Sequence, residues 1–180
     1  LQVKDIELLY KFCEEIGLGK ERVKIYKSAR QNESDSARIY IAMKEFTKEV
    51  VNIKNVIILD KIPNNLMRHF IRGIFDGDGC IYGRGTKYYS VNFAALDWVS
   101  EFLISELPYL KSYPDKRTPG LSTVTTNKQS DLIDIYNYLY TESEIYLTRK
   151  YDKFNQAFHF ASTTRANARR NKRSEIRSTV

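Results

Sequence analysis

The stretch FIRGIFDGDGCIY, residues 70–82, decides the fold of this 180-residue chain. Five of the eight glycines lie between positions 73 and 85. Apolar and small residues recur there at steps of three and four, which predicts one helix that ends at Gly79 and is followed by a strand. Its packing face holds Leu66, Phe70, Gly73, Ile74 and Gly77. Because glycine has no Cβ, a second helix could approach this face closely.

Two acids, Asp76 and Asp78, lie at the end of the predicted helix. Acidic side chains are disfavoured at a helix C-terminus, since the helix dipole already presents partial negative charge there. A nearby cation would remove that cost, and hard divalent metals prefer carboxylate and carbonyl oxygen. The sequence therefore predicts a cation beside this helix end.

Residues 71–79, IRGIFDGDG, resemble the LAGLIDADG motif of homing endonucleases, with Arg72 in place of the small second residue. In that family two such helices pack side by side, and the second aspartate of each ligates magnesium. The resemblance implies that Asp78, with Gly77 beside it, binds Mg²⁺ or another divalent metal such as Mn²⁺, and that Asp78 is catalytic. The alternative is an ordinary amphipathic helix that ends in an Asp-Gly turn.

The net charge of +7 and the pI of about 9.3 predict a polyanionic partner. Nucleic acid is the first candidate and an anionic membrane surface the second. No apolar run approaches the ~18 residues of a membrane span, and the first residues do not resemble a signal peptide. Two cysteines are too few for a disulfide framework. We expect a cytoplasmic protein, in a bacterial or phage-infected cell.

Helices and hairpins alternate on both sides of the motif. Before it, residues 5–17 predict a helix, 23–29 and 37–43 an antiparallel hairpin, and 44–52 a short helix, and an apolar run over 56–62 leads to Pro63. After it, we expect strands over 80–84 and 88–94, a helix over 97–107, a hairpin of 111–117 with 122–126, a long helix, and an amphipathic segment over 144–160. Trp98, Phe102, Leu103 and Leu107 are expected on the inner face of the helix over 97–107.

The order of elements in residues 1–55 returns in residues 91–151, which indicates an internal repeat. The family module is αββαββα, used twice to form a saddle-shaped antiparallel sheet, which is an α/β (α+β) fold. We therefore predict a partial first repeat over 1–60 without its opening helix and first strands, a complete second repeat over 61–160, and a basic tail over 161–180. One motif is present where a two-repeat enzyme needs two. An upstream segment or a second chain is expected to supply the other helix.

The resemblance also implies three further catalytic residues. A basic residue follows the last helix of each family module, and Lys150 matches that position, with Lys54 as its equivalent in the first repeat. Their implied role is to polarise the attacking water or to neutralise charge. Gln2 matches a polar residue that positions the water. The alternative for each lysine is an ordinary solvated side chain.

Contacts to DNA are expected from outward side chains of the strands, because a twisted antiparallel sheet can lie in a major groove. The predicted residues are Lys24, Tyr26, Arg38 and Tyr40 in the first repeat, and Tyr82, Arg84, Lys87, Tyr89, Lys116 and Arg117 in the second. The tail adds Arg169, Arg170, Lys172 and Arg173. Alone, this tail should be disordered or weakly helical, and should bind phosphates in a salt-dependent way.

These features predict a metal-dependent, site-specific endonuclease that cleaves both strands of double-stranded DNA. The leading rival is a relative that binds without cutting, either a DNA-binding regulator or an RNA maturase. A membrane or general interaction module would explain the charge but not the FDGDG sequence.

Overall fold

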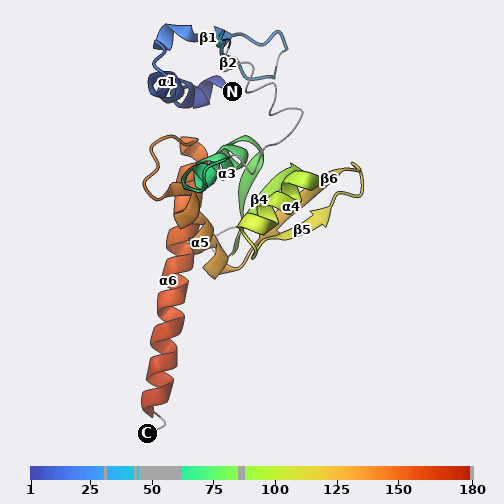
Figure 1. Cartoon of the computed structure of the whole chain (residues 1–180). Helices are drawn as coiled ribbons and strands as arrows, with labels where there is room; N and C mark the ends of the chain where they lie inside the picture. The colour runs from blue at the N-terminus through green and yellow to red at the C-terminus, as the bar shows by residue number, and fades with distance from the viewer. Residues whose placement is uncertain (31, 43, 45–61, 85–87, 179–180) are drawn as a thin grey trace. The chain divides into compact units, whose positions relative to one another are not determined.

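The structure, a computed structural model, describes residues 1–30, 32–42, 44, 62–84 and 88–178, without the side chains of Arg84 and residues 165–178. The chain divides into two compact units, Leu1–Met67 and Arg68–Val180 (Figure 1). The predicted mixed α/β class with antiparallel sheets is confirmed.

The first unit is a helix followed by a hairpin. Its elements are η1 (Val3–Asp5), α1 (Ile6–Glu15), η2 (Lys20–Arg22), β1 (Val23–Tyr26) and β2 (Ser36–Ile39). The two strands pair antiparallel, as predicted, and Gln2 forms an isolated bridge with Ser36. The buried residues Cys13 and Ala37 lie between helix and hairpin. The predicted helix over 44–52 and the apolar run over 56–62 lie outside the described residues, apart from Lys44 and Ile62.

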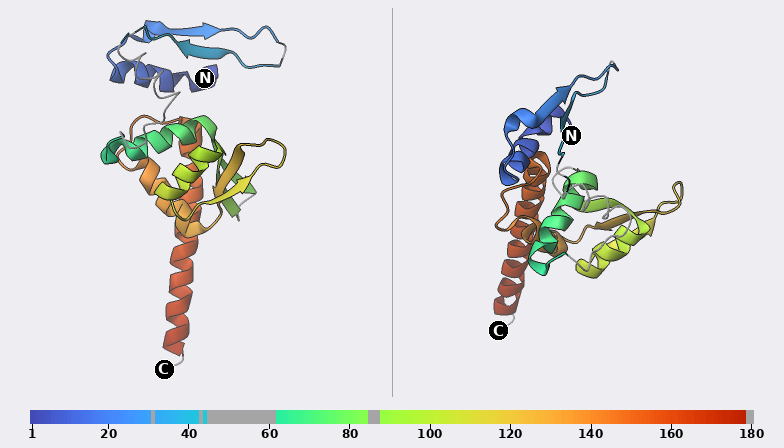
Figure 2. Two further views of the ribbon diagram at one scale, coloured as in Figure 1. Left: turned by 45° about the vertical axis from the view of Figure 1, so that its right-hand side comes forward. Right: turned by 45° about the horizontal axis from the view of Figure 1, so that its top comes forward.

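The second unit is one antiparallel sheet with helices on one face (Figure 2). Its elements are α3 (Asn64–Asp78), whose first turn belongs to the first unit, β3 (Gly79–Arg84), β4 (Tyr88–Leu96), α4 (Asp97–Glu106), β5 (Lys111–Pro114), β6 (Leu121–Thr126), α5 (Gln129–Tyr140) and α6 (Thr148–Ser178). The strand order is β3-β4-β6-β5. The predicted central helix is confirmed: it starts after Pro63 and stops where Gly79 begins a strand.

Alternation along the strands separates a covered face from an open face, because successive side chains point to opposite sides of a sheet. Ile81, Val91 and Phe93 are buried on the covered face. The ring of Phe75 on α3 packs against Phe93 at 5.4 Å and against Phe154 of α6 at 5.7 Å between centroids. This aromatic contact fixes α3 between the sheet and α6.

Two sequence expectations about the helices are wrong. Trp98 was expected on the inner face of α4, yet its side chain is 43% exposed, while Phe102, Leu103 and Leu107 are buried as predicted. The tail was expected to be disordered or weakly helical, yet α6 continues through it to Ser178. A helix that is already nucleated by packing extends at little cost through residues of good helix propensity, such as alanine and arginine.

Gly120 closes the turn between β5 and β6 with φ +83°, a conformation that residues with a Cβ rarely adopt. Its carbonyl also accepts the N–H of Asp97, the first residue of α4, at 3.1 Å. Replacing Gly120 with alanine should lower the free energy of unfolding by about 1–2 kcal/mol. Urea denaturation measures this loss, and Thr118→Ala in the same turn is the control. If Gly120→Ala and the wild type had equal free energies of unfolding, the expected backbone strain of an alanine at position 120 would be contradicted.

None of the described helices is long and apolar enough to cross a membrane.

Candidate active site and nucleic-acid interface

Asp78 is the last residue of α3, and its side chain is exposed. Asp76 lies two residues earlier and so points to a different side of the helix. It is half-buried, and its Oδ2 accepts the backbone N–H of Leu147 at 3.0 Å. The two acids of the motif therefore have different environments. Asp78 faces solvent, and Asp76 anchors the segment that leads into α6.

Burial raises the pKa of Asp76, and the Leu147 N–H and the positive charges of Lys150 and Arg72 oppose that rise. Its second oxygen, Oδ1, is buried without a hydrogen-bond partner among the described residues. The hydroxyl of Tyr140 is the other buried side-chain atom of the described chain in this condition. Burial and, next, the nearby charge of Asp76 raise the pKa of Tyr140.

Lys150 of α6 is buried, with 8% of its surface exposed, so the solvated alternative is wrong. Its Nζ donates to the carbonyls of Phe75, Asp76 and Gly77 at 2.8, 2.7 and 3.3 Å. An ammonium group has three N–H donors, and all three are used here. Burial and Arg149 lower the pKa of Lys150, whereas Asp76 and Asp78 raise it. Lys150 therefore places a positive charge beside the acidic end of α3, where the sequence predicts a cation.

Arg72, the departure from the motif, is also buried, with 6% exposed. Its Nε donates to the carbonyl of Ile145 at 2.8 Å, and one terminal nitrogen donates to the carbonyl of Leu139 at 3.0 Å and to Oγ of Ser143 at 2.6 Å. Burial lowers the pKa of this guanidinium, and Asp76 acts in the opposite direction. Arg72 therefore ties α3 to the connection between α5 and α6.

The face of α3 that carries its glycines is uncovered in the described chain. Gly73 and Gly77 are exposed, and a Cβ built at either would meet nothing within 4 Å. Leu66 on the same face is 48% exposed. The buried face is instead the one with Met67, Ile71 and Phe75. The small-residue face predicted to receive a helix is thus open.

The residues present fit a divalent metal as part of a ligand set. No group of three or more His, Cys, Asp or Glu side chains that could hold a metal occurs among the described residues. Mg²⁺, however, is commonly held by one or two carboxylates, with water and phosphate completing the shell. Asp78 could supply one carboxylate. The carbonyl of Gly77 already accepts the long contact from Lys150, which leaves Asp78 as the stronger ligand.

The other predicted catalytic residues are placed as follows. Gln2 is exposed and precedes η1, where its backbone bridges Ser36. Lys54 lies outside the described residues. Gln2 belongs to the first unit and Asp78 to the second.

The hairpin of the first unit presents a basic and aromatic face. Lys24 and Arg38 are cross-strand partners, and Tyr26 and Tyr40 follow them two residues along each strand, so the four side chains share one face. All four are exposed. The guanidinium of Arg38 lies over the ring of Tyr26 at 5.0 Å, and the two tyrosine rings are 6.4 Å apart. The four DNA contacts predicted for the first repeat therefore lie on one face of the hairpin.

On the second sheet the predicted residues divide. Tyr82 lies on the open face, and Lys116 and Arg117 are exposed in the β5–β6 turn. Tyr89 was assigned the wrong face, because its ring packs against Phe160 of α6 at 5.6 Å. The backbone of Arg84 pairs with Tyr88, and Lys87 is outside the described residues.

Sequence reasoning missed several residues of the open face. The cross-strand rows of the sheet place them beside Tyr82 and Cys80, and their signal was the alternation along β4, β5 and β6. They are Ser90, Asn92, Lys111, Tyr113, Thr123 and Thr125. In the tail, Arg169, Arg170, Lys172 and Arg173 lie on the helical backbone of α6.

No family model and no curated protein matches the chain. Solved structures do match it. The meganuclease I-SmaMI bound to uncleavable DNA aligns with 99% of this chain and 83% of its own at 14% identity, with a TM-score of 0.60. The same LAGLIDADG homing endonuclease bound to cleaved DNA aligns with 93% of this chain and 78% of its own at 15% identity, with a TM-score of 0.57. A third structure of I-SmaMI, with uncleaved DNA and calcium, gives 14% identity over 93% and 80% of the two chains and a TM-score of 0.57.

Proposed function

We propose that this chain, which has the fold of the LAGLIDADG homing endonucleases, binds double-stranded DNA and takes part in its site-specific, metal-dependent cleavage. The observation that carries the proposal is Asp78. It is an exposed carboxylate at the end of a helix whose glycine face is open. In this fold that helix end is where two repeats would meet.

Hydrolysis of a phosphodiester needs an activated water and neutralisation of charge on the phosphate and on the leaving oxygen. A divalent ion bound there would supply this Lewis-acid chemistry. Asp78 would be the ligand from this chain, with the carbonyl of Gly77 beside it, and Mg²⁺ or Mn²⁺ is the proposed ion. The three N–H groups of Lys150 are donated to backbone carbonyls. Lys150 would therefore act through its positive charge near Asp78. Gln2 and Lys54 are proposed to position and polarise the water.

A second helix is needed to complete such a site. Both units run from a helix into an antiparallel hairpin, which supports our proposal that residues 1–60 belong to a first repeat and residues 61–160 form the second. The other helix would come from an upstream segment or from a second chain. It would cover the open face of α3, and the strands of both repeats would together form the DNA-binding saddle.

DNA would lie against the exposed faces of the strands. The first hairpin offers Lys24, Tyr26, Arg38 and Tyr40, and the second unit offers Tyr82, Arg84, Lys87, Lys116 and Arg117. The basic tail of residues 161–180 would add contacts to phosphates that weaken with salt. We propose a cytoplasmic protein, because the nucleic acid must be accessible to it.

The experiment that tests this function is cleavage of a randomised duplex library by the full chain with Mg²⁺, with an EDTA control. Cut products that share one sequence support the proposal. Binding without cutting would remove the nuclease part. Absence of binding at low salt would remove the DNA-binding part as well. Sedimentation of the protein–DNA complex separates one chain from two per site.

Replacing Gly73 with alanine tests the proposed helix pairing. Since a Cβ there meets nothing in the described chain, the substitution should raise the free energy of unfolding by about 0.5–1 kcal/mol through helix propensity. The same methyl group would hold a second helix away, so cleavage should fall. The control is Asn65→Ala in the exposed first turn of α3. Wild-type cleavage by a stabilised Gly73→Ala variant would contradict close helix pairing at this face.

A DNA-binding regulator or an RNA maturase is the second candidate function. It is favoured by the fact that Lys150 has no N–H left to donate to water, and by the single exposed acid at the helix end. Competition between duplex DNA and structured RNA of equal length, in wild-type protein without cleavage, would distinguish these two alternatives.

A further inference from the structure

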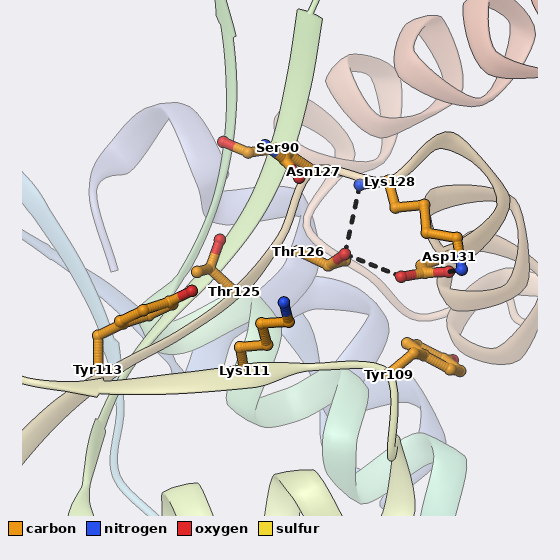
Figure 3. A pocket seen from close by; sticks show the side chains of 9 residues that line it. All are labelled: Ser90, Tyr109, Lys111, Tyr113, Thr125, Thr126, Asn127, Lys128 and Asp131. Atoms are coloured by element: carbon orange, nitrogen blue, oxygen red, sulfur yellow. Dashed lines mark hydrogen bonds and ion pairs between the residues drawn. The ribbon is translucent and has the colours of Figure 1, made fainter.

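A polar pocket of about 450 Å³ lies on the second unit where β4, β5 and β6 meet the start of α5 (Figure 3). Strand β5 is one edge of the sheet, and the pocket lies beside the open face because Lys111 and Thr125 are cross-strand partners on that face. Four of the residues that line it belong to the open face of the sheet described above, and no specific contact has yet been assigned to any of the nine. They are Ser90, Tyr109, Lys111, Tyr113, Thr125, Thr126, Asn127, Lys128 and Asp131.

The one carboxylate of the pocket is already neutralised. Asp131 is buried, and its Oδ2 accepts the hydroxyl of Thr126 at 2.9 Å. Its Oδ1 accepts the hydroxyl of Ser130 at 2.9 Å and forms an ion pair with Nζ of Lys128 at 3.4 Å. These contacts account for the negative charge of Asp131 and for the positive charge of Lys128.

Lys111 is the cation that remains. Its side chain projects into the pocket, and its Nζ has no hydrogen-bond or ion-pair partner among the described residues (Figure 3). Lys111 and Thr125 are cross-strand partners, and the hydroxyl of Thr125 is committed to the carbonyl of Val91 at 2.8 Å. The pocket therefore has one unpaired positive charge near its centre.

Neutral donors also line the pocket. Oγ of Ser90 accepts the amide of Asn92 at 3.3 Å, so its own O–H remains to donate into the pocket. Asn127 contributes an exposed amide. Burial and two nearby acids raise the pKa of Tyr109 to about 12, so its hydroxyl keeps its proton at neutral pH. A pocket that holds one positive charge and is lined by neutral donors suits an anion with several acceptor oxygens.

We infer that this pocket holds a phosphate of the DNA backbone, with Lys111 as its main ligand. The inference rests on the proposed function, and it adds a contact at the β5 edge of the sheet. The ammonium group of Lys111 would repel a metal ion. Guanine N7 and O6 also accept hydrogen bonds, and the base-substitution arm of the test below distinguishes a guanine edge from a phosphate. The volume exceeds that of a single phosphate group, which leaves room for the attached sugars.

The test is the salt dependence of DNA binding by the full chain, measured as the slope of log K against log salt concentration for wild type and Lys111→Met. Loss of one phosphate contact should reduce the slope by about 0.9. The decrease in affinity should be the same for the target and for single-base variants of it. Lys111→Arg should keep the wild-type slope. Lys153→Met is the control, since it removes an exposed lysine of α6 outside the pocket.

The outcomes separate this inference from the proposed function. If wild type binds DNA and Lys111→Met has the wild-type slope, the pocket is not a phosphate site although the function stands. An equal change in Lys153→Met would show an effect of net charge alone, which also overturns the inference. A loss confined to one base pair would show base recognition in its place. If wild type does not bind DNA, the proposed function itself fails.

Discussion

Replacing Asp78 with asparagine is expected to lower the rate of DNA cleavage by at least about 10²-fold, the usual effect of losing one preorganised charge-stabilising group at a reaction centre. The affinity for DNA should stay within a few-fold of wild type. Asp78 is exposed, and no hydrogen bond or ion pair joins its side chain to another described residue, so the variant should fold normally. Asparagine keeps the shape of the side chain and removes the charge that would bind the ion.

The matched control is Asp152→Asn, which removes one exposed carboxylate from α6 and gives the same change in net charge. Single-turnover cleavage and equilibrium binding should be measured on the same duplex for both variants. If Asp78→Asn cleaves at the wild-type rate, Asp78 is not a metal ligand and the helix end is not the reaction centre. If binding is lost together with cleavage, the carboxylate has a structural role.

Replacing Lys150 with methionine should lower the free energy of unfolding by roughly 2–4 kcal/mol, because buried backbone carbonyls that lose their donor keep the cost of desolvation. Three carbonyls at the end of α3 depend on this one ammonium group. Methionine fills the same space, so little of the loss should come from packing. Urea denaturation at neutral pH measures the change.

Lys153→Met, one turn along the same helix and exposed, is the control and should differ from wild type by less than about 0.5 kcal/mol. Lys150→Arg keeps the charge but not the compact shape of the ammonium, and an intermediate loss is expected. Wild-type stability of Lys150→Met would show that the carbonyls find other partners. The proposed electrostatic role beneath Asp78 would then lose its structural basis.

Much of the fold could be predicted from local sequence. Pro63 and Gly79 mark the ends of the central helix, and alternating residues mark the hairpins. Alternation of apolar and polar residues separates the two faces of a strand, but it does not show which face the helices cover. For this reason Tyr89 was predicted on the same DNA-contacting face as Tyr82, whereas its ring packs against Phe160. Neighbouring strands and α6 decide this, and they are distant in sequence.

The candidate site was predictable only in part. Asp78 follows from the motif, whereas the partners of Arg72 and Lys150 are some seventy residues away from them. No periodicity within α3 could indicate that Arg72 would be buried, since charged residues on a helix are ordinarily solvated. Lys111 was overlooked for the same reason. Within the described part of the chain Lys111 has no ion-pair partner, and this becomes visible only when Asp131 is seen to be neutralised by other residues.

The contacts of Arg72 also bear on how this protein could be re-engineered. Its guanidinium is the donor to the carbonyls of Leu139 and Ile145. A chimaera that imported α3 from a homologue with a small residue at this position would leave both carbonyls unsatisfied in the interior. Helix α3 and the α5–α6 connection therefore depend on each other, and a working chimaera has to exchange both segments together.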